Sequence, residues 1–269
     1  MIRPGHLHPP HPFLWRLAGP LLVPAAMVFA SEPARTRTLA EGLAAGDEQY
    51  SAAHLEQAVA AYREALQASP ASLAALCRLA RSESELGETQ KGDEQRRTWA
   101  SAVAHARDAV RIAPDSAIAH TRLAVALGRQ ALREGPSTRL ALSREIKSEA
   151  DRAIALDATQ DFAWHVLAVW NVKIASLNAF ERLAARAVLG GVPKGASIAG
   201  GEEAFGKAIA IAPTFVNHHL EYGRLLKDQK RNADARRELE RATSLPPTSS
   251  ALDARYQAEA RALLEKLPR

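Results

Sequence analysis

A block of residues that recurs five times dominates this sequence. Each copy ends with an alanine that stands five positions before a proline or, in one copy, before another alanine. The paired residues are Ala65 and Pro70, Ala109 and Pro114, Ala153 and Ala158, Ala208 and Pro213, and Ala242 and Pro247. Units that repeat in this way stack into a solenoid, because each unit leaves an apolar face that its neighbours cover. The repeat therefore predicts an array of stacked units, a class of fold that usually works as a binding surface.

The period of the last copy identifies the kind of solenoid. The step from Pro213 to Pro247 is 34 residues, which is the length of a tetratricopeptide repeat. This step also carries the large and small residues of that repeat in order before the helix-stopping proline, namely Tyr222, Gly223, Ala235, Leu239 and Ala242. Small residues at such positions let two antiparallel helices pack closely. We therefore predict an all-α, tetratricopeptide-type α-solenoid.

The register of the repeats predicts about five helix pairs and a C-terminal capping helix. Hydrophobic residues make up 47% of the chain and aromatic residues only 5%, so alanine and leucine, which favour helices, dominate the apolar content. No linker rich in serine, glycine or proline divides the repeats, so one array is expected. The predicted units are residues 39–72, 73–116, 117–160, 161–215 and 216–249, followed by the cap in 250–269. The expected polar outer face of the cap consists of Asp253, Arg255, Glu259, Arg261 and Glu265.

The units are unequal in length. Successive terminal residues from Pro70 to Pro213 are separated by steps of 44, 44 and 55 residues. The first two steps are longer than the plain 34-residue repeat. Their extra residues fall at turn-forming residues between paired helices and predict longer helices joined by polar loops. The third addition, residues 176–203, contains an apolar, basic stretch at 180–189 and then a Gly-Gly-Val-Pro turn, which predicts one additional short helix. Gly200 and Gly201 should interrupt the start of the helix that follows.

The first 30 residues have the composition of a secretory signal peptide. Arg3 and Arg16 precede an apolar run of 14 residues that ends at Ala30, and a basic start, a short apolar core and a small residue at the cut are its usual features. This run contains two prolines and is too short to span a membrane comfortably as a helix. We expect cleavage after Ala30, a short leader at 31–38, and a periplasmic or secreted protein with no membrane span. The alternative is an uncleaved N-terminal segment that anchors the chain.

Charge and cysteine content narrow the possible partners. Removing residues 1–30 takes away two arginines and no acid, so the formal net charge falls from +5 to +3. This excess of positive charge is too small to indicate a nucleic-acid partner. Cys77 is the only cysteine, so no disulfide can form within the chain and stability has to come from helix packing.

Four segments resemble the regulator of microtubule dynamics family. They are Leu123–Arg129, Asp161–Trp170, the Gly190–Pro193 turn after a basic helix, and Val216–Arg224. The resemblance covers roughly residues 39–264, and the Trp-His and His-His pairs within it are more specific than the general repeat pattern. It implies a helical repeat protein that binds a partner and has no enzymatic activity. The specific role that the family suggests is that of a membrane-anchored regulator of microtubules.

The residues able to perform chemistry do not form a recognisable catalytic set. The sequence contains no Gly-rich phosphate loop, no nucleophile elbow and no His-Glu-x-x-His run, so we expect no catalytic residues and no cofactor. His165, His218 and His219 lie on the first helices of neighbouring units, where they could hold a metal ion. The interpretation that we favour is that these imidazoles hydrogen-bond the adjacent turns, which leaves no metal site.

The repeat register also predicts a binding surface. In this kind of array the first helix of each pair lines the concave face, and basic residues recur there at equivalent positions. A cationic rim above an apolar floor suits an extended peptide that carries acidic groups. The residues expected to bind it are Arg81, Arg129, Phe162, His165, Val169, Lys173, Asn217, Arg224 and Lys227. The sequence thus favours a non-catalytic scaffold or adaptor that binds a protein or peptide.

Overall fold

The computed structural model describes residues 37–189, 191–246 and 250–268. The chain divides into two units, Met1–Arg35 and Thr36–Arg269. The first unit lies outside the described residues, so the predicted signal peptide and its cleavage after Ala30 do too. Among the helices of the described part, none combines the length and apolar character needed to cross a membrane.

The described residues form twelve α-helices and no strand. The helices are α1 (Leu39–Ser51), α2 (Leu55–Ala68), α3 (Leu73–Thr89), α4 (Gly92–Ile112), α5 (Ala117–Ala131), α6 (Pro136–Leu156), α7 (Asp161–Ala175), α8 (Ala179–Leu189), α9 (Ile198–Ile211), α10 (Val216–Asp228), α11 (Asn232–Ser244) and α12 (Asp253–Glu265).

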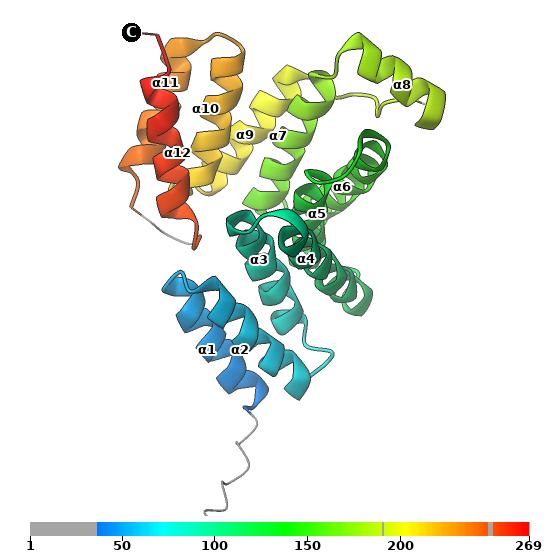
Figure 1. Ribbon diagram of the computed structural model, residues 1–269, viewed down its shortest axis with the longest axis vertical. Coiled ribbons are helices and arrows are strands. Elements are labelled where there is room, and N and C mark those ends of the chain that lie inside the picture. The colour runs from blue at the N-terminus through cyan, green and yellow to red at the C-terminus, as the bar shows by residue number, and fades with distance from the viewer. Residues whose placement is uncertain (1–36, 190, 247–249, 269) are drawn as a thin grey trace, which may run out of the picture. The chain divides into compact units, whose positions relative to one another are not determined.

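Ten of these helices pack as five pairs. The partners are α1 with α2, α3 with α4, α5 with α6, α7 with α9, and α10 with α11. The first helices of the pairs also contact one another in order, from α1 through α3, α5 and α7 to α10, and together they form what we call the first-helix face. The last helix, α12, packs on α10 and α11 (Figure 1). The predicted all-α solenoid of five pairs and a C-terminal helix is confirmed.

Serine hydroxyls fix the points at which two first helices begin. Ser72 and Ser116 each stand two residues after the proline that ends the preceding repeat. Their side chains accept hydrogen bonds from the backbone N–H groups of Ala75, at 3.3 Å, and Ala119, at 3.4 Å. An N-cap of this kind satisfies a donor that the first helical turn leaves free. The Pro-x-Ser spacing therefore sets the register of α3 and α5.

The alanines of the repeat pattern explain how closely the paired helices approach. Ala65, Ala109, Ala153, Ala208 and Ala242 are all completely buried. Gly42 of α1 lies against Ala65 of α2, where an added Cβ would stand only 2.8–2.9 Å from the side chain and backbone of Ala65. A larger residue at either side of such a contact would push the two helices apart.

We expect Ala109→Leu to lower the free energy of unfolding by about 1–3 kcal/mol, because the longer side chain overpacks the contact of α4 with its neighbours. Ala109 is completely buried in a cluster with Leu76, Cys77 and Ala119. Urea unfolding followed by circular dichroism measures the effect. Ala100→Leu, at an exposed position of the same helix, is the matched control. Equal stability of the two variants would contradict the predicted register.

The insert in the fourth unit forms α8, in agreement with the short helix predicted at 180–189. It contacts α6 and leaves Phe180 and Leu183 exposed. The expected interruption at Gly200 and Gly201 is wrong, because both glycines lie inside the continuous helix α9. A Cβ on Gly201 would lie 2.7 Å from Cγ2 of Val172, so the glycine allows α9 to pack closely on α7.

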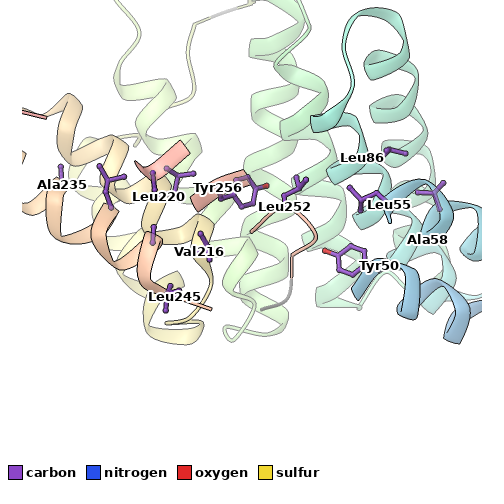
Figure 2. Packing of buried hydrophobic residues seen from close by; sticks show 14 of the residues in the cluster. Tyr50, Leu55, Ala58, Leu86, Val216, Leu220, Ala235, Leu245, Leu252 and Tyr256 are labelled. Carbon is purple, nitrogen blue, oxygen red and sulfur yellow. The ribbon is translucent and has the colours of Figure 1, made fainter. Parts of the chain in front are cut away.

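The polar outer face predicted for the cap needs one correction. Arg255, Arg261 and Glu265 are exposed, but Asp253 at the start of α12 is buried with only 1% of its surface exposed. The residue before it, Leu252, is buried as well. Figure 2 shows Leu252 between Tyr50 of the first pair and the side chains of the last pair.

Candidate functional site

A small cavity opens on the first-helix face, with a volume of about 30 Å³. Residues of α3, α5, α7 and α10 form most of its wall, and two residues near the C-terminus complete it. The lining residues are Arg81, Ser84, Glu85, Arg122, Val125, Arg129, Phe162, Phe215, Asn217, Ser250 and Tyr256. The cavity combines three guanidinium groups with an apolar wall of two phenylalanines and a valine.

Four of the nine predicted binding residues meet at this cavity, namely Arg81, Arg129, Phe162 and Asn217. The rings of Phe162 and Phe215 pack edge to face, with their centroids 4.8 Å apart. Asn217 follows in the first turn of α10 and is 6% exposed. These four residues come from α3, α5, α7 and α10, which are the first helices of four consecutive pairs. The repeat register therefore brings one predicted residue from each of them to a single point.

The other five predicted residues lie elsewhere. Val169 packs in a separate cluster around Phe205, and Lys173 is exposed on α7. Arg224 forms ion pairs with Glu221 and with Glu259 of α12. Lys227 lies 3.8 Å from the carboxylate of Asp228. His165, the fifth, is buried in the array and contacts His218.

Two of the cavity arginines already have carboxylate partners. Nε of Arg81 lies 3.4 Å from Oε1 of Glu85, and its guanidinium stacks over the ring of Tyr50 at 4.3 Å. Arg129 forms a 2.5 Å ion pair with Glu88. These contacts partly neutralise the basic positions that the sequence predicts as a rim.

The segment that leads into α12 occupies part of the first-helix face. The hydroxyl of Ser250 donates to Glu85 at 3.1 Å, and the backbone N–H of Ala251 donates to the hydroxyl of Tyr50 at 3.4 Å. Tyr256 donates from its hydroxyl to Glu88 at 3.0 Å, and Arg255 donates to the backbone carbonyl of Glu88. A stretch of the chain's own C-terminal region therefore binds α1 and α3 through both side-chain and backbone groups.

Two of the three candidate histidines meet, but not in a metal-binding arrangement. Nε2 of His218 lies 2.9 Å from the carboxylate of Asp161, and its Nδ1 lies 3.0 Å from Nδ1 of His165. Since an ionised carboxylate only accepts, a neutral His218 donates from Nε2 and accepts at Nδ1 from His165. Burial is the main reason that the pKa values of both imidazoles are lowered. This chain of hydrogen bonds joins α7 to α10.

The third histidine, His219, turns away and fixes the preceding turn, as predicted for these residues. Its Nε2 lies 3.0 Å from the carbonyl oxygen of Pro213, and its Nδ1 lies 2.7 Å from Glu238. His120 makes the same contact two units earlier, with Nε2 2.8 Å from the carbonyl of Pro114. Within the described ranges, no group of three or more histidine, cysteine or acidic residues has the arrangement of a metal site.

The buried histidine pair predicts a loss of stability in acid. Because folding lowers the pKa of His165 and His218, the unfolded chain binds more protons below its ordinary histidine pKa of about 6.5. The free energy of unfolding should therefore fall between pH 7 and pH 5, by up to about 1.4 kcal/mol per pH unit for each imidazole.

Urea titrations at both pH values measure this loss. His165→Gln should reduce the loss, and the exposed control His54→Gln should not. An unchanged pH dependence in His165→Gln would refute the assignment.

The sequence did not identify Arg122, Phe215, Ser250 or Tyr256 as part of the site. Arg122 lies seven residues before the predicted Arg129 on α5, which is about two helical turns, so the same face of that helix carries both residues. The C-terminal residues carried no signal, because their position depends on contacts with helices more than 160 residues away.

Comparison with known proteins identifies the family. The model of the family described as regulator of microtubule dynamics protein 1-3 matches residues 42–268. The chain belongs to this family. The matched range includes all the helices from α2 to α12, and with them the whole cavity, so the resemblance found in four segments extends over the array. No curated protein matches the sequence.

Solved structures with the same fold are tetratricopeptide repeat proteins. The chain is similar to TTC0263, a thermophilic TPR protein of Thermus thermophilus, with a TM-score of 0.60 and 16% identity over 82% of this chain and 98% of that chain. It is also similar to yeast Tom70, with a TM-score of 0.50 and 12% identity over 85% of this chain and 39% of that chain. At such low identity, the similarity shows a shared fold.

Proposed function

We propose that this protein is a non-catalytic scaffold that binds a protein or peptide segment on its first-helix face. The observation that carries the proposal is the docking of the chain's own segment, Ser250 to Tyr256, on α1 and α3. That segment uses backbone N–H, hydroxyl and guanidinium donors against Glu85, Glu88 and Tyr50. A foreign segment can use the same kinds of contact, which are those of peptide recognition on helical surfaces.

The acidic character of the ligand is a finer part of the proposal. The cavity brings three arginines to one place beside Phe162 and Phe215, and only one acid, Glu85, lines it. Charge-assisted hydrogen bonds from guanidinium groups to carboxylates are among the strongest available at such a surface. The ligand is therefore expected to place acidic and apolar side chains next to each other.

Selection from a displayed peptide library against the full chain tests the proposal. Selected peptides should bind at least tenfold more weakly to Val125→Lys, because the added charged side chain fills a cavity of about 30 Å³. Ala100→Lys, at an exposed position of the second helix α4, is the matched control and should bind normally. Peptides that bind both variants equally, or a library that yields no ligand, would overturn the proposal.

Export remains part of this proposal and is supported by the sequence of residues 1–30, with Ser31 as the expected first residue of the mature protein. N-terminal sequencing of the native protein tests it. An intact N-terminus would favour the anchored alternative and, with the family's name, a role in regulating microtubules. Cosedimentation of the full chain with polymerised tubulin would measure that role directly, and no cosedimentation would count against it.

A further inference from the structure

The charges around the cavity do not balance. Three guanidinium groups face it, those of Arg81, Arg122 and Arg129. Glu85 pairs with Arg81 and also accepts hydrogen bonds from Tyr50, at 2.6 Å, and Ser250, at 3.1 Å. Glu88 pairs with Arg129. The two carboxylates thus neutralise Arg81 and Arg129, and the positive charge of Arg122 remains without a partner in the described chain.

Arg122 has no hydrogen bond or ion pair within the described part of the chain. Its Nε is fully buried without a partner, and its guanidinium carbon lies 5.5 Å from the ring centroid of Phe162. Burial, followed by the positive charge of Arg81, lowers the pKa of Arg122 to about 10. Arg122 as a whole is half-buried and lines the cavity with no anion from the described ranges paired to it, so an anion placed there would gain a charge-assisted hydrogen bond from its guanidinium group.

Asn217 provides a second, independent sign of a missing ligand. Its side chain lines the same cavity, is 6% exposed, and carries an Oδ1 atom with no hydrogen-bond partner among the described residues. The carboxamide can rotate to present either its oxygen or its NH₂ group, because the two ends have nearly the same shape. A buried polar side-chain atom without a partner is uncommon in folded proteins, so a polar group from outside is expected to pair with it.

We propose that Arg122 and Asn217 form a binding site for a single carboxylate group. The guanidinium group would hold both carboxylate oxygens in its fork, and the Asn217 amide would donate to one of them. One negative charge balances the one positive charge left over, so a singly charged carboxylate is expected in preference to a phosphate group of nearly two charges. The carboxylate would come from an acidic side chain or from the C-terminus of the bound segment, so this inference rests on the proposed function.

Acetate binding to the full chain tests the site without any assumption about the partner. We expect saturable NMR chemical-shift changes at the backbone amide of Val125 on titration with sodium acetate at constant ionic strength, and none with acetamide. Arg122→Gln should weaken acetate binding at least tenfold, and Arg97→Gln, at an exposed position of α4, should leave it unchanged. Asn217→Asp should abolish acetate binding, because it places a carboxylate of the protein itself beside Arg122.

Further arms of the titration identify the source of the carboxylate. The α-amide of N-acetylglutamate carries only a side-chain carboxylate, and N-acetylalanine carries only a terminal one. The compound that binds more tightly shows which kind of carboxylate the site prefers. Equal shifts in Arg122→Gln and Arg97→Gln, or tighter binding of inorganic phosphate than of acetate, would overturn the site. If selected peptides bind Arg122→Gln normally, the site fails and the scaffold function stands. If acetate binds but the library yields no ligand, the carboxylate site stands and the scaffold function fails.

Discussion

Truncating the chain after Pro247 should lower its thermal unfolding temperature sharply and make it aggregate. The deletion removes Leu252, Tyr256 and Leu267, each no more than 5% exposed, from the cluster that they share with α10 and α11. At about 1.5–3 kcal/mol for each buried side chain, the loss is about 5 kcal/mol or more, which is comparable to the whole stability of many domains. Calorimetry and light scattering measure both effects.

The matched control for this truncation ends after Leu267 and lacks only two residues. It keeps every buried side chain of α12 and should remain monomeric with nearly the stability of the full chain. A chain ending at Pro247 that stays monomeric and equally stable would mean that α12 does not protect the fifth pair.

Glu83→Ala should reduce the free energy of unfolding by about 3 kcal/mol, because the substitution leaves several hydrogen-bond donors without their acceptor. Glu83 is completely buried on α3. Its carboxylate accepts hydrogen bonds from Arg63 of α2 at 2.7 Å, from Ser101 at 2.9 Å, and from His105 of α4 at 2.8 Å. It therefore joins the first pair of helices to the second.

Urea unfolding measures the loss, with Glu56→Ala at an exposed position of α2 as the control. Glu83→Gln keeps the shape of the side chain and part of its hydrogen bonding, so it should cost less than Glu83→Ala. An equal and small effect of all three substitutions would show that the buried carboxylate does not link the helices.

The sequence predicted the fold well because a solenoid depends on contacts between neighbours. The small residue at Ala109 and the proline at Pro114 are requirements of one helix pair and the turn after it, so they are visible in a single repeat. The break predicted at Gly200 and Gly201 was wrong, because glycine lowers intrinsic helix propensity while here it permits close packing of α9 on α7.

The site was predicted only in part, for a physical reason. The register places Arg81, Arg129, Phe162 and Asn217 on the inward arc of their helices, and these residues do meet. Whether a basic residue is free or paired depends on acids elsewhere in the fold, which no local pattern reveals. Glu83 shows the same limit, because it stands in the polar run Arg81-Ser82-Glu83-Ser84-Glu85 yet is completely buried.

The docking of the C-terminal segment on α1 and α3 also bears on how the protein unfolds. Arrays whose units touch only their neighbours lose structure gradually from their ends. Here hydrogen bonds join residues 165 to 201 positions apart, so fraying of either end would break contacts with the other. The array should therefore unfold in one concerted transition. It should also fold more slowly than a solenoid of similar length, because its last contacts require closing loops of 165 to 201 residues.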